Sequence, residues 1–322
     1  MPHLPWHNHL FVPVLLRVLL LIAVGFAAVL VARRRRHPLR VWRRSTLFLR
    51  ARSWLVIGLL FVVAVFTGGV VAFLLASYAV IWGLAELARV IGIPRRYALL
   101  LLLWGEVGLL VAALARDFFI FLPFGFFILL ALIAILSGGE EAPGDTGAEG
   151  GAQQHGARQV ADTLFAYVYV ALPLAYIVYA ESSRPWGLNF LVVVAVAVAC
   201  SDIAAFVAGS ALKGPRIPGF DAGKSWTGAL GNLIGAAVAV ALLWVAVPKL
   251  WSIAEVVVLT VVVAFGCVWG DLTASLVERW FPTTAPGTIL VGYGGVLDRV
   301  DSLLMAFPLS FYAVLLTEKL LR

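Results

Sequence analysis

Charged residues are scarce in this sequence. They make up 13% of its 322 residues, against about 25% in soluble globular domains, while hydrophobic residues reach 62%. A chain this apolar would aggregate in water, which excludes a soluble enzyme and an intrinsically disordered protein. Its only two cysteines, Cys200 and Cys267, both lie within apolar runs. That placement excludes a disulfide-stabilised scaffold and is typical of small buried side chains.

Histidine is absent from the second half of the chain, because the last of the five histidines is His155. This argues against a histidine general base or a histidine-ligated zinc in that half. The net charge is +7, but nine arginines lie between Arg33 and Arg52, directly after the first apolar run. Basic residues there are typical of a cytoplasmic loop that contacts anionic lipids, which argues against nucleic acid as a partner.

Long apolar runs are what the chain has in quantity. A membrane-spanning helix needs about 20 mostly apolar residues. Runs near this length lie at 10–32, 53–68, 70–91, 97–115, 117–136, 162–180, 187–208, 226–247, 252–271 and 301–318. The second run is short, and Gly68-Gly69 could mark a break within a bent hairpin, so the count is about nine or ten. The sequence predicts an all-α, polytopic integral membrane protein.

Basic residues are divided unequally between the loops. With ten spans and loop 33–52 in the cytoplasm, the cytoplasmic loops hold eighteen of the 24 Lys and Arg residues. The positive-inside rule then predicts a multi-pass protein of the inner (cytoplasmic) membrane. One of these loops, 137–161, is rich in Gly, Ala, Glu and Gln, which predicts a flexible cytoplasmic linker. It would separate N-terminal transmembrane helices (1–136) from a C-terminal catalytic transmembrane domain (162–322).

Polar residues gather in the C-terminal half, at the predicted cytoplasmic ends of the spans. Asp202 follows an apolar run at membrane depth, where an ionisable residue usually has a function. The next loop contains Lys213 and Arg216, and then Lys224, where the following helix is expected to begin. Glycines, a lysine and a helix N-terminus favour phosphate binding. The spacing is not that of a P-loop, and an ordinary basic loop is the alternative.

Three further aspartates follow. Asp271 closes an apolar run, and Asp298 and Asp301 are three residues apart, so a helix places both carboxylates on one face. With Asp202 they predict a Mg²⁺ site, since Mg²⁺ prefers oxygen ligands and shares them with phosphates. Arg299 could then contact a phosphate. Helix capping is the alternative, but it explains one aspartate per helix and not four carboxylates at one membrane face.

These residues also carry a family resemblance. The stretch from Ser275 to Asp301 resembles the signature of the phosphatidate cytidylyltransferases, or CDP-diacylglycerol synthases, and its tail from Gly294 to Leu303 matches closely. Upstream, Ser201-Asp202 and Lys224-Ser225-Trp226 resemble a second region of that family. The resemblance is strong over about residues 200–308, and over the first half it is limited to the layout of the spans.

The resemblance implies that phosphatidate and CTP react at the cytoplasmic membrane face to give CDP-diacylglycerol and pyrophosphate. It also implies Mg²⁺ as cofactor, membrane lipids as surroundings and a homodimer as assembly. The implied metal ligands are Asp202, Asp271, Asp298 and Asp301, and the implied catalytic residues are Asp271, Asp298, Asp301 and Lys224. The implied substrate-binding residues are Arg299, Ser275, Lys213, Arg216, Gly294 and Gly295.

Several positions depart from the family pattern. Glu278 stands where the signature has lysine, and Thr284-Ala285 stands where it has Lys-Asp. Two lysines are thus lost and a glutamate is gained beside a proposed polyphosphate site, so we expect weaker phosphate binding or a different headgroup or nucleotide. The alternatives are a lipid-phosphate nucleotidyltransferase with altered substrate, and a catalytically weak membrane scaffold that binds lipid. A transporter fits less well, because the charges cluster at one face and not near the midplane.

Overall fold

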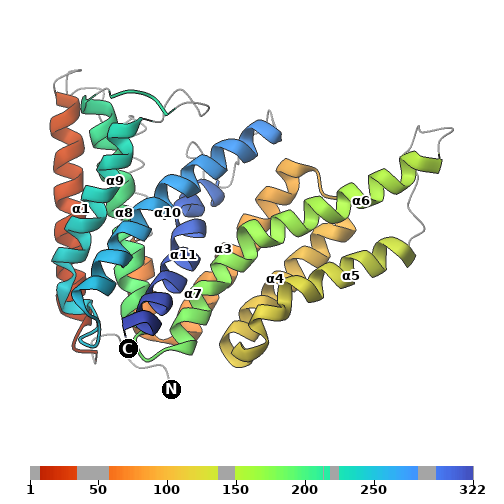
Figure 1. Ribbon diagram of the computed structural model, residues 1–322, viewed down its shortest axis with the longest axis horizontal. Helices are drawn as coiled ribbons and strands as arrows, with labels where there is room; N and C mark the ends of the chain where they lie inside the picture. The colour runs from red at the N-terminus through yellow and green to blue at the C-terminus, as the bar shows by residue number, and fades with distance from the viewer. Residues whose placement is uncertain are drawn as a thin grey trace.

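The computed structural model describes residues 8–34, 58–136, 149–212, 214–217, 225–281 and 295–321. It describes only the helical backbone of Phe26, 28–34, 149–155, Ser210, Asp298 and Arg299. These residues are mostly helical, with one isolated β-bridge, between Arg216 and Ser225. Figure 1 shows a row of inclined helices. The elements are α1 (Phe11–Arg34), α3 (Gly69–Ile91), α4 (Arg95–Leu114), η3 (Arg116–Phe121), α5 (Leu122–Leu136), α6 (Glu149–Ala166), η4 (Tyr167–Ala171), α7 (Leu172–Ser183), α8 (Gly187–Leu212), α9 (Trp226–Leu242), η5 (Trp244–Ala246), α10 (Ile253–Trp280) and α11 (Leu297–Leu321).

Seven helices of the described part are long and apolar enough to cross a membrane. They are Gly69–Ile91, Arg95–Leu114, Arg116–Leu136, Gly156–Ser183, Gly187–Gly209, Ile253–Trp280 and Val300–Leu321. Shorter apolar helices occupy Phe11–Gly25, Gly58–Thr67 and Trp226–Leu242, where the other three spans were expected. The prediction of an all-α, polytopic membrane protein is confirmed for the described residues, and the count of nine or ten spans stays a prediction.

Two hydrophobic cores hold these helices together. The first, here named the α4 core, is built around buried side chains such as Leu84, Leu101 and Leu109 and combines α3, α4 and α5 with α6, η4 and α7. The second, named the α8 core, combines α1 and the segment 58–67 with α7 to α11. Helix α11 enters both, since Leu304 lies in the α4 core and Phe311 in the α8 core.

The predicted linker 137–161 differs from the structure in its second part. Residues from Glu149 onward form α6, so 149–161 is helical, and its role as a flexible linker stays a prediction. The Ala, Gln and Glu residues that suggested a solvated linker are also good helix formers, and Val160 packs against the α4 core. Residues 137–148 lie outside the described part. The division of the chain at this linker stays a prediction, although both cores draw helices from both sides of it.

Small residues let neighbouring helices approach closely at the C-terminal end of the chain. A Cβ atom at Gly231 or Gly235 of α9 would lie 2.7 or 2.5 Å from a backbone carbonyl oxygen of α8. A Cβ at Gly270 of α10 would lie 2.5 Å from the carbonyl oxygen of Asp301 in α11. Glycines four residues apart typically permit such backbone contact between membrane helices. This close packing joins α9 to α8 and α10 to α11, and the α8 core holds the two pairs together.

Candidate active site

The candidate site lies where α8, α10 and α11 meet. Asp202 is ten residues before the end of α8, Asp271 is nine residues before the end of α10, and Asp301 is in the second turn of α11. In Figure 1 the end of α8, the start of α9, the end of α10 and the start of α11 lie toward the upper end of the molecule. Residues far apart in sequence are therefore presented from one end of the bundle.

A serine that the sequence reasoning missed links two of these helices. The Ser302 hydroxyl donates a hydrogen bond to Oδ1 of Asp202 over 3.1 Å, across 100 residues of sequence. Ser302 is 2% exposed, and its backbone N–H donates to Oδ1 of the adjacent Asp301 over 2.7 Å. Charge-assisted hydrogen bonds of this kind are stronger than neutral ones. Ser302 therefore fixes the relative positions of two predicted metal ligands.

Three of the four predicted metal ligands lie on helices that pack against one another. Asp202 accepts from the hydroxyl of Ser302, the residue after Asp301, and Gly270, next to Asp271, packs against the Asp301 carbonyl oxygen. All three are half-buried and offer carboxylate oxygens, the donors that Mg²⁺ prefers. Within the described side chains no group of three or more Asp, Glu, His or Cys residues is close enough to bind a metal ion. The fourth carboxylate, that of Asp298, lies outside those side chains.

The predicted phosphate-binding loop is described at its two ends. Helix α9 begins at Trp226, and the Ser225 hydroxyl caps it by accepting from the Gly228 N–H over 3.2 Å. The Trp226 N–H donates to the Pro215 carbonyl over 3.0 Å, so the two ends of the loop are joined and Arg216 is exposed beside them. The expected helix start directly after Lys224 is therefore confirmed. Lys213 and Lys224 themselves lie outside the described residues.

The structure describes the remaining predicted site residues to different extents. The Ser275 hydroxyl donates to the Asp271 carbonyl one turn earlier, over 2.9 Å, so it lies next to the acidic cluster but bonds to its own helix. Gly294 lies outside the described residues. Gly295 is buried, and a Cβ atom there would overlap the carboxylate of Glu86. The backbone of Asp298 and Arg299 lies in the first turn of α11, as the spacing predicted.

Glu86 is the second residue that sequence reasoning missed. It lies three residues before Arg89 near a helix end, and this spacing by itself favours a simple interfacial pair. In the structure Arg89 donates from Nε to the Ala85 carbonyl of its own helix. The Glu86 carboxylate instead accepts from the Leu297 N–H at the start of α11. One signal was present in the sequence: Gly295-Val296, before this helix, offers no side chain that can cap it.

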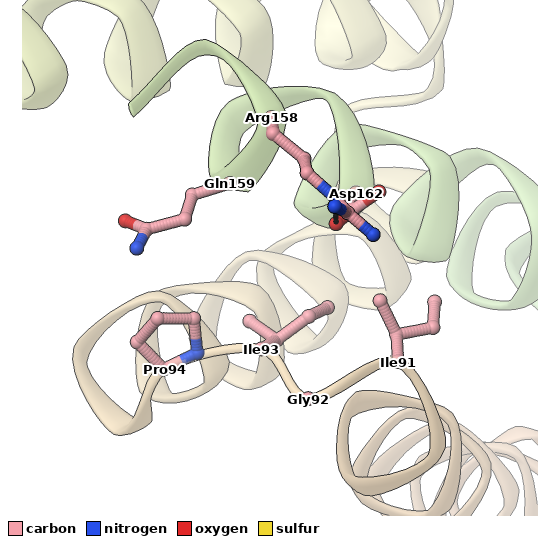
Figure 2. Close-up of a pocket in the computed structure, with 7 residues that line it drawn as sticks. All are labelled: Ile91, Gly92, Ile93, Pro94, Arg158, Gln159 and Asp162. Atoms are coloured by element: carbon pink, nitrogen blue, oxygen red, sulfur yellow. Dashed lines mark ion pairs between the residues drawn. The ribbon is translucent and has the colours of Figure 1, made fainter. Parts of the chain in front are cut away.

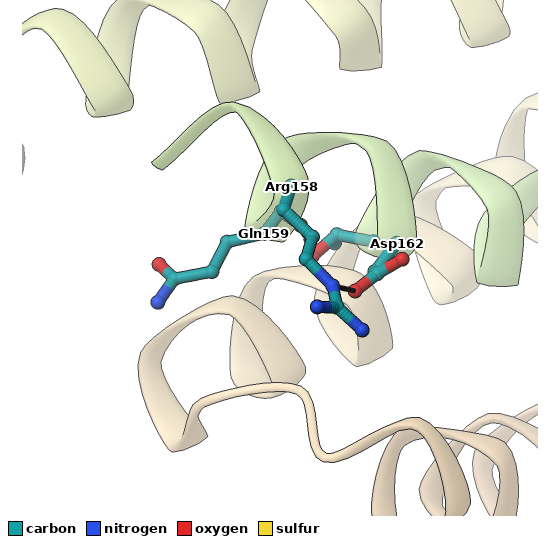
Figure 3. A network of polar contacts seen from close by, with 4 residues as sticks. Arg158, Gln159 and Asp162 are labelled. Atoms are coloured by element: carbon teal, nitrogen blue, oxygen red, sulfur yellow. Dashed lines mark hydrogen bonds and ion pairs between the residues drawn. The ribbon is translucent and has the colours of Figure 1, made fainter. Parts of the chain in front are cut away.

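A pocket of about 230 Å³ lies elsewhere, between the α3–α4 turn and α6. Figure 2 shows its lining, which consists of Ile91, Gly92, Ile93, Pro94, Arg158, Gln159 and Asp162. Nε of Arg158 lies 3.7 Å from Oδ2 of Asp162, as Figure 3 shows, so its two charged side chains form an ion pair with each other. None of the predicted site residues lines this pocket, and we do not assign it to the reaction.

Comparison with known proteins points to one family. Residues 48–317 match the cytidylyltransferase family. The chain is 38% identical over 152 residues to the phosphatidate cytidylyltransferase of Brucella suis biovar 1. This match covers 46% of this chain and 54% of that protein. It is 33% identical over 132 residues to that of Haemophilus influenzae, covering 39% and 46%. Chloroplastic phosphatidate cytidylyltransferase 5 of Arabidopsis thaliana is 31% identical over 125 residues, covering 39% and 31%. The chain thus matches about half the length of these relatives, or less.

Proposed function

This chain belongs to the cytidylyltransferase family, and from that premise we propose that it transfers the cytidylyl group of CTP to phosphatidate or a related lipid phosphate in phospholipid biosynthesis. A phosphate oxygen of the lipid attacks the α-phosphorus of CTP. The bond from this phosphorus to the oxygen that bridges to the β-phosphate breaks, pyrophosphate leaves, and CDP-diacylglycerol forms. Relatives named phosphatidate cytidylyltransferase support this pair of substrates.

The packing of the three helices that carry Asp202, Asp271 and Asp301 is the observation that carries this proposal: Ser302 is hydrogen-bonded to Asp202 and Asp301, and Gly270, next to Asp271, packs against the Asp301 carbonyl oxygen. A transfer between two anionic phosphates needs charge neutralisation and positioning more than it needs a dedicated base. These three carboxylates with Asp298 are the proposed ligands of Mg²⁺. When bound, the ion would neutralise phosphate charge that the carboxylates alone would repel.

The basic and small residues are proposed to hold the phosphates. Lys224 precedes the capped start of α9, where helix N–H groups add to anion binding, and Arg299 lies in the first turn of α11. The side-chain cations would contact phosphate oxygens directly. We assign substrate binding also to Ser275, Lys213, Arg216, Gly294 and Gly295.

The membrane helices suit a substrate with acyl chains. Their apolar surfaces would keep the chains of the lipid within the bilayer, while its phosphate reaches the polar ends of α8, α10 and α11. From the distribution of basic residues we propose that this end faces the cytoplasm and that the protein lies in the inner membrane. A homodimer is the proposed assembly.

The test is a turnover assay on purified protein in mixed micelles, with phosphatidate, Mg²⁺ and each of the four nucleoside triphosphates. We expect pyrophosphate and CDP-diacylglycerol with CTP alone. Asp301→Asn should lower turnover by at least about 100-fold, since it weakens a proposed metal ligand. The matched control is Asp117→Asn, an exposed acid of η3, which should leave turnover unchanged.

Other outcomes distinguish the alternatives. Pyrophosphate release with another nucleotide or another lipid phosphate would show a nucleotidyltransferase with altered substrate, in line with Glu278 and Thr284-Ala285. Protein that binds phosphatidate but releases no pyrophosphate with any nucleotide would contradict the proposal and favour a lipid-binding scaffold.

A further inference from the structure

We propose that Glu86 of α3 is a positioning residue for the active site, because it holds the first turn of α11, the helix that carries Asp298 and Asp301. Oε2 of Glu86 accepts a hydrogen bond from the Leu297 N–H over 3.2 Å, across 211 residues of sequence. Glu86 is only 7% exposed. A carboxylate so buried is costly unless it is hydrogen-bonded, so its place at this helix start is specific.

The start of α11 is not capped by the residue that precedes it. Val296 precedes its first residue, Leu297, and a valine side chain has no acceptor for the free N–H groups of a helix N-terminus. The Glu86 carboxylate supplies that acceptor from another helix, and its negative charge is favourable at the positive end of the helix dipole. Gly295 belongs to the same arrangement, because any side chain there would collide with the Glu86 carboxylate.

Two anchors hold the short segment from Leu297 to Ser302. Glu86 of α3 binds its first N–H, and Asp202 of α8 binds the Ser302 hydroxyl at its other end. Leu297 and Val300 also pack against the α4 core, to which Leu304 belongs. The segment contains the backbone of Asp298 and Asp301, so the two anchors fix the rotation and height of both aspartates. The N-terminal helices thereby set the geometry of a site whose predicted residues all lie in the C-terminal half.

The experiment compares Glu86→Ala and Glu86→Gln in the full-length protein in detergent. Hydrogen exchange of a peptide that covers 297–301 reports the cap directly and requires no activity. We expect Glu86→Ala to speed exchange there by about tenfold, the scale of a lost helix cap. Glu86→Gln keeps an acceptor oxygen, so its exchange should stay near that of the unchanged protein.

The second measurement is the Mg²⁺ concentration for half-maximal turnover, and this part rests on the proposed function. In Glu86→Ala, misplaced carboxylates should raise this Mg²⁺ concentration by at least about tenfold. In Glu86→Gln, it should return most of the way to the value of the unchanged protein. If Glu86→Ala is not recovered folded, Glu86→Asp takes its place. It keeps the charge but shortens the reach by one methylene, and it should shift both measurements in the same direction.

The matched control is Glu255→Ala. Glu255 is also buried, at 2% exposure, and also caps a helix, since its Oε2 accepts from the Ser252 N–H at the start of α10. That start lies about 27 Å along α10 from Asp271. Glu255→Ala should therefore destabilise the protein without changing exchange at 297–301 or the Mg²⁺ requirement.

Three results would contradict either the proposed role of Glu86 or the proposed function. Unchanged exchange at 297–301 in Glu86→Ala overturns the cap. Faster exchange with the same Mg²⁺ requirement as Glu255→Ala overturns the positioning role. A protein without cytidylyltransferase activity refutes the proposed function only, and the exchange measurement still decides whether Glu86 holds α11.

Discussion

Ser302 joins two helices through one hydroxyl group, and its replacement isolates that contact. Ser302→Ala removes the donor to Asp202 and leaves a half-buried carboxylate with one partner fewer. A hydrogen bond to a charged group contributes about 1.5–3 kcal/mol. We expect the free energy of unfolding to fall by that amount in denaturant titrations in detergent, and turnover to fall with it.

The control for Ser302→Ala is Thr273→Ala. The Thr273 hydroxyl donates to the Trp269 carbonyl of its own helix, at an exposed position, so its loss should change the free energy of unfolding by less than about 0.5 kcal/mol. Equal effects of the two substitutions would mean that the bond between Ser302 and Asp202 contributes nothing specific to the fold.

At the scale of single residues, the sequence identifies the acidic residues of the candidate site but not their hydrogen-bond partners. Asp202 and Asp271 stand out because a carboxylate within an apolar span is costly and therefore conspicuous. The structure supports their association with Asp301. Glu86 was not recognisable as part of this arrangement, because its partner is a backbone N–H 211 residues away. Every residue except proline has such a group, so Gly295-Val296 could indicate that α11 needs a cap from elsewhere but not that Glu86 supplies it.

Among the elements, the contact between α10 and α11 depends on Gly270. A Cβ atom there would lie 2.5 Å from the Asp301 carbonyl oxygen and 2.8 Å from the Ser302 Cα, so Gly270→Ala must move the helices apart. Overpacking of this kind costs about 1–3 kcal/mol. A displacement of about 1 Å at a catalytic group can lower rates by about 100-fold, and we expect a loss of turnover on that scale.

Gly156→Ala is the matched control for Gly270→Ala. Gly156 lies within α6, and a Cβ atom there would meet no atom within 4 Å. Alanine is favoured over glycine in a helix by about 1 kcal/mol, so this variant should be equally stable or slightly more stable, with full turnover. Full turnover in Gly270→Ala would contradict the close fit between α10 and α11.

The helices could be predicted from the sequence wherever an apolar run is long enough to span a membrane. Every expected span corresponds to a helix in the described residues, because a backbone in lipid must satisfy its hydrogen bonds within a helix. The helix at 149–161 could not be predicted, because the polar composition of this segment suits a solvated linker and a helix equally well. Contact with the α4 core decides between the two, and that contact depends on tertiary structure.

For the whole molecule, the two cores and the helix between them determine how the protein unfolds. Helix α11 contributes Leu304 to the α4 core and Phe307 and Phe311 to the α8 core. Helix α7 also packs in both. Because these helices cannot leave one core without disturbing the other, we expect both cores to unfold together.

Cys267 offers a probe for this cooperativity, since its thiol is fully buried in the α8 core. With Cys200 replaced by alanine, thiol labelling during heating reports the unfolding of that core alone. Leu101→Ala removes a fully buried side chain of the α4 core and should cost about 2–5 kcal/mol. If the cores unfold as one, the labelling midpoint of Cys267 falls by several degrees.

The control is Leu103→Ala, on the same helix but 66% exposed, which should leave the labelling midpoint nearly unchanged. A Cys267 midpoint that does not move in Leu101→Ala would show that the cores unfold independently, and that the connection through α11 transmits geometry to the site but not stability.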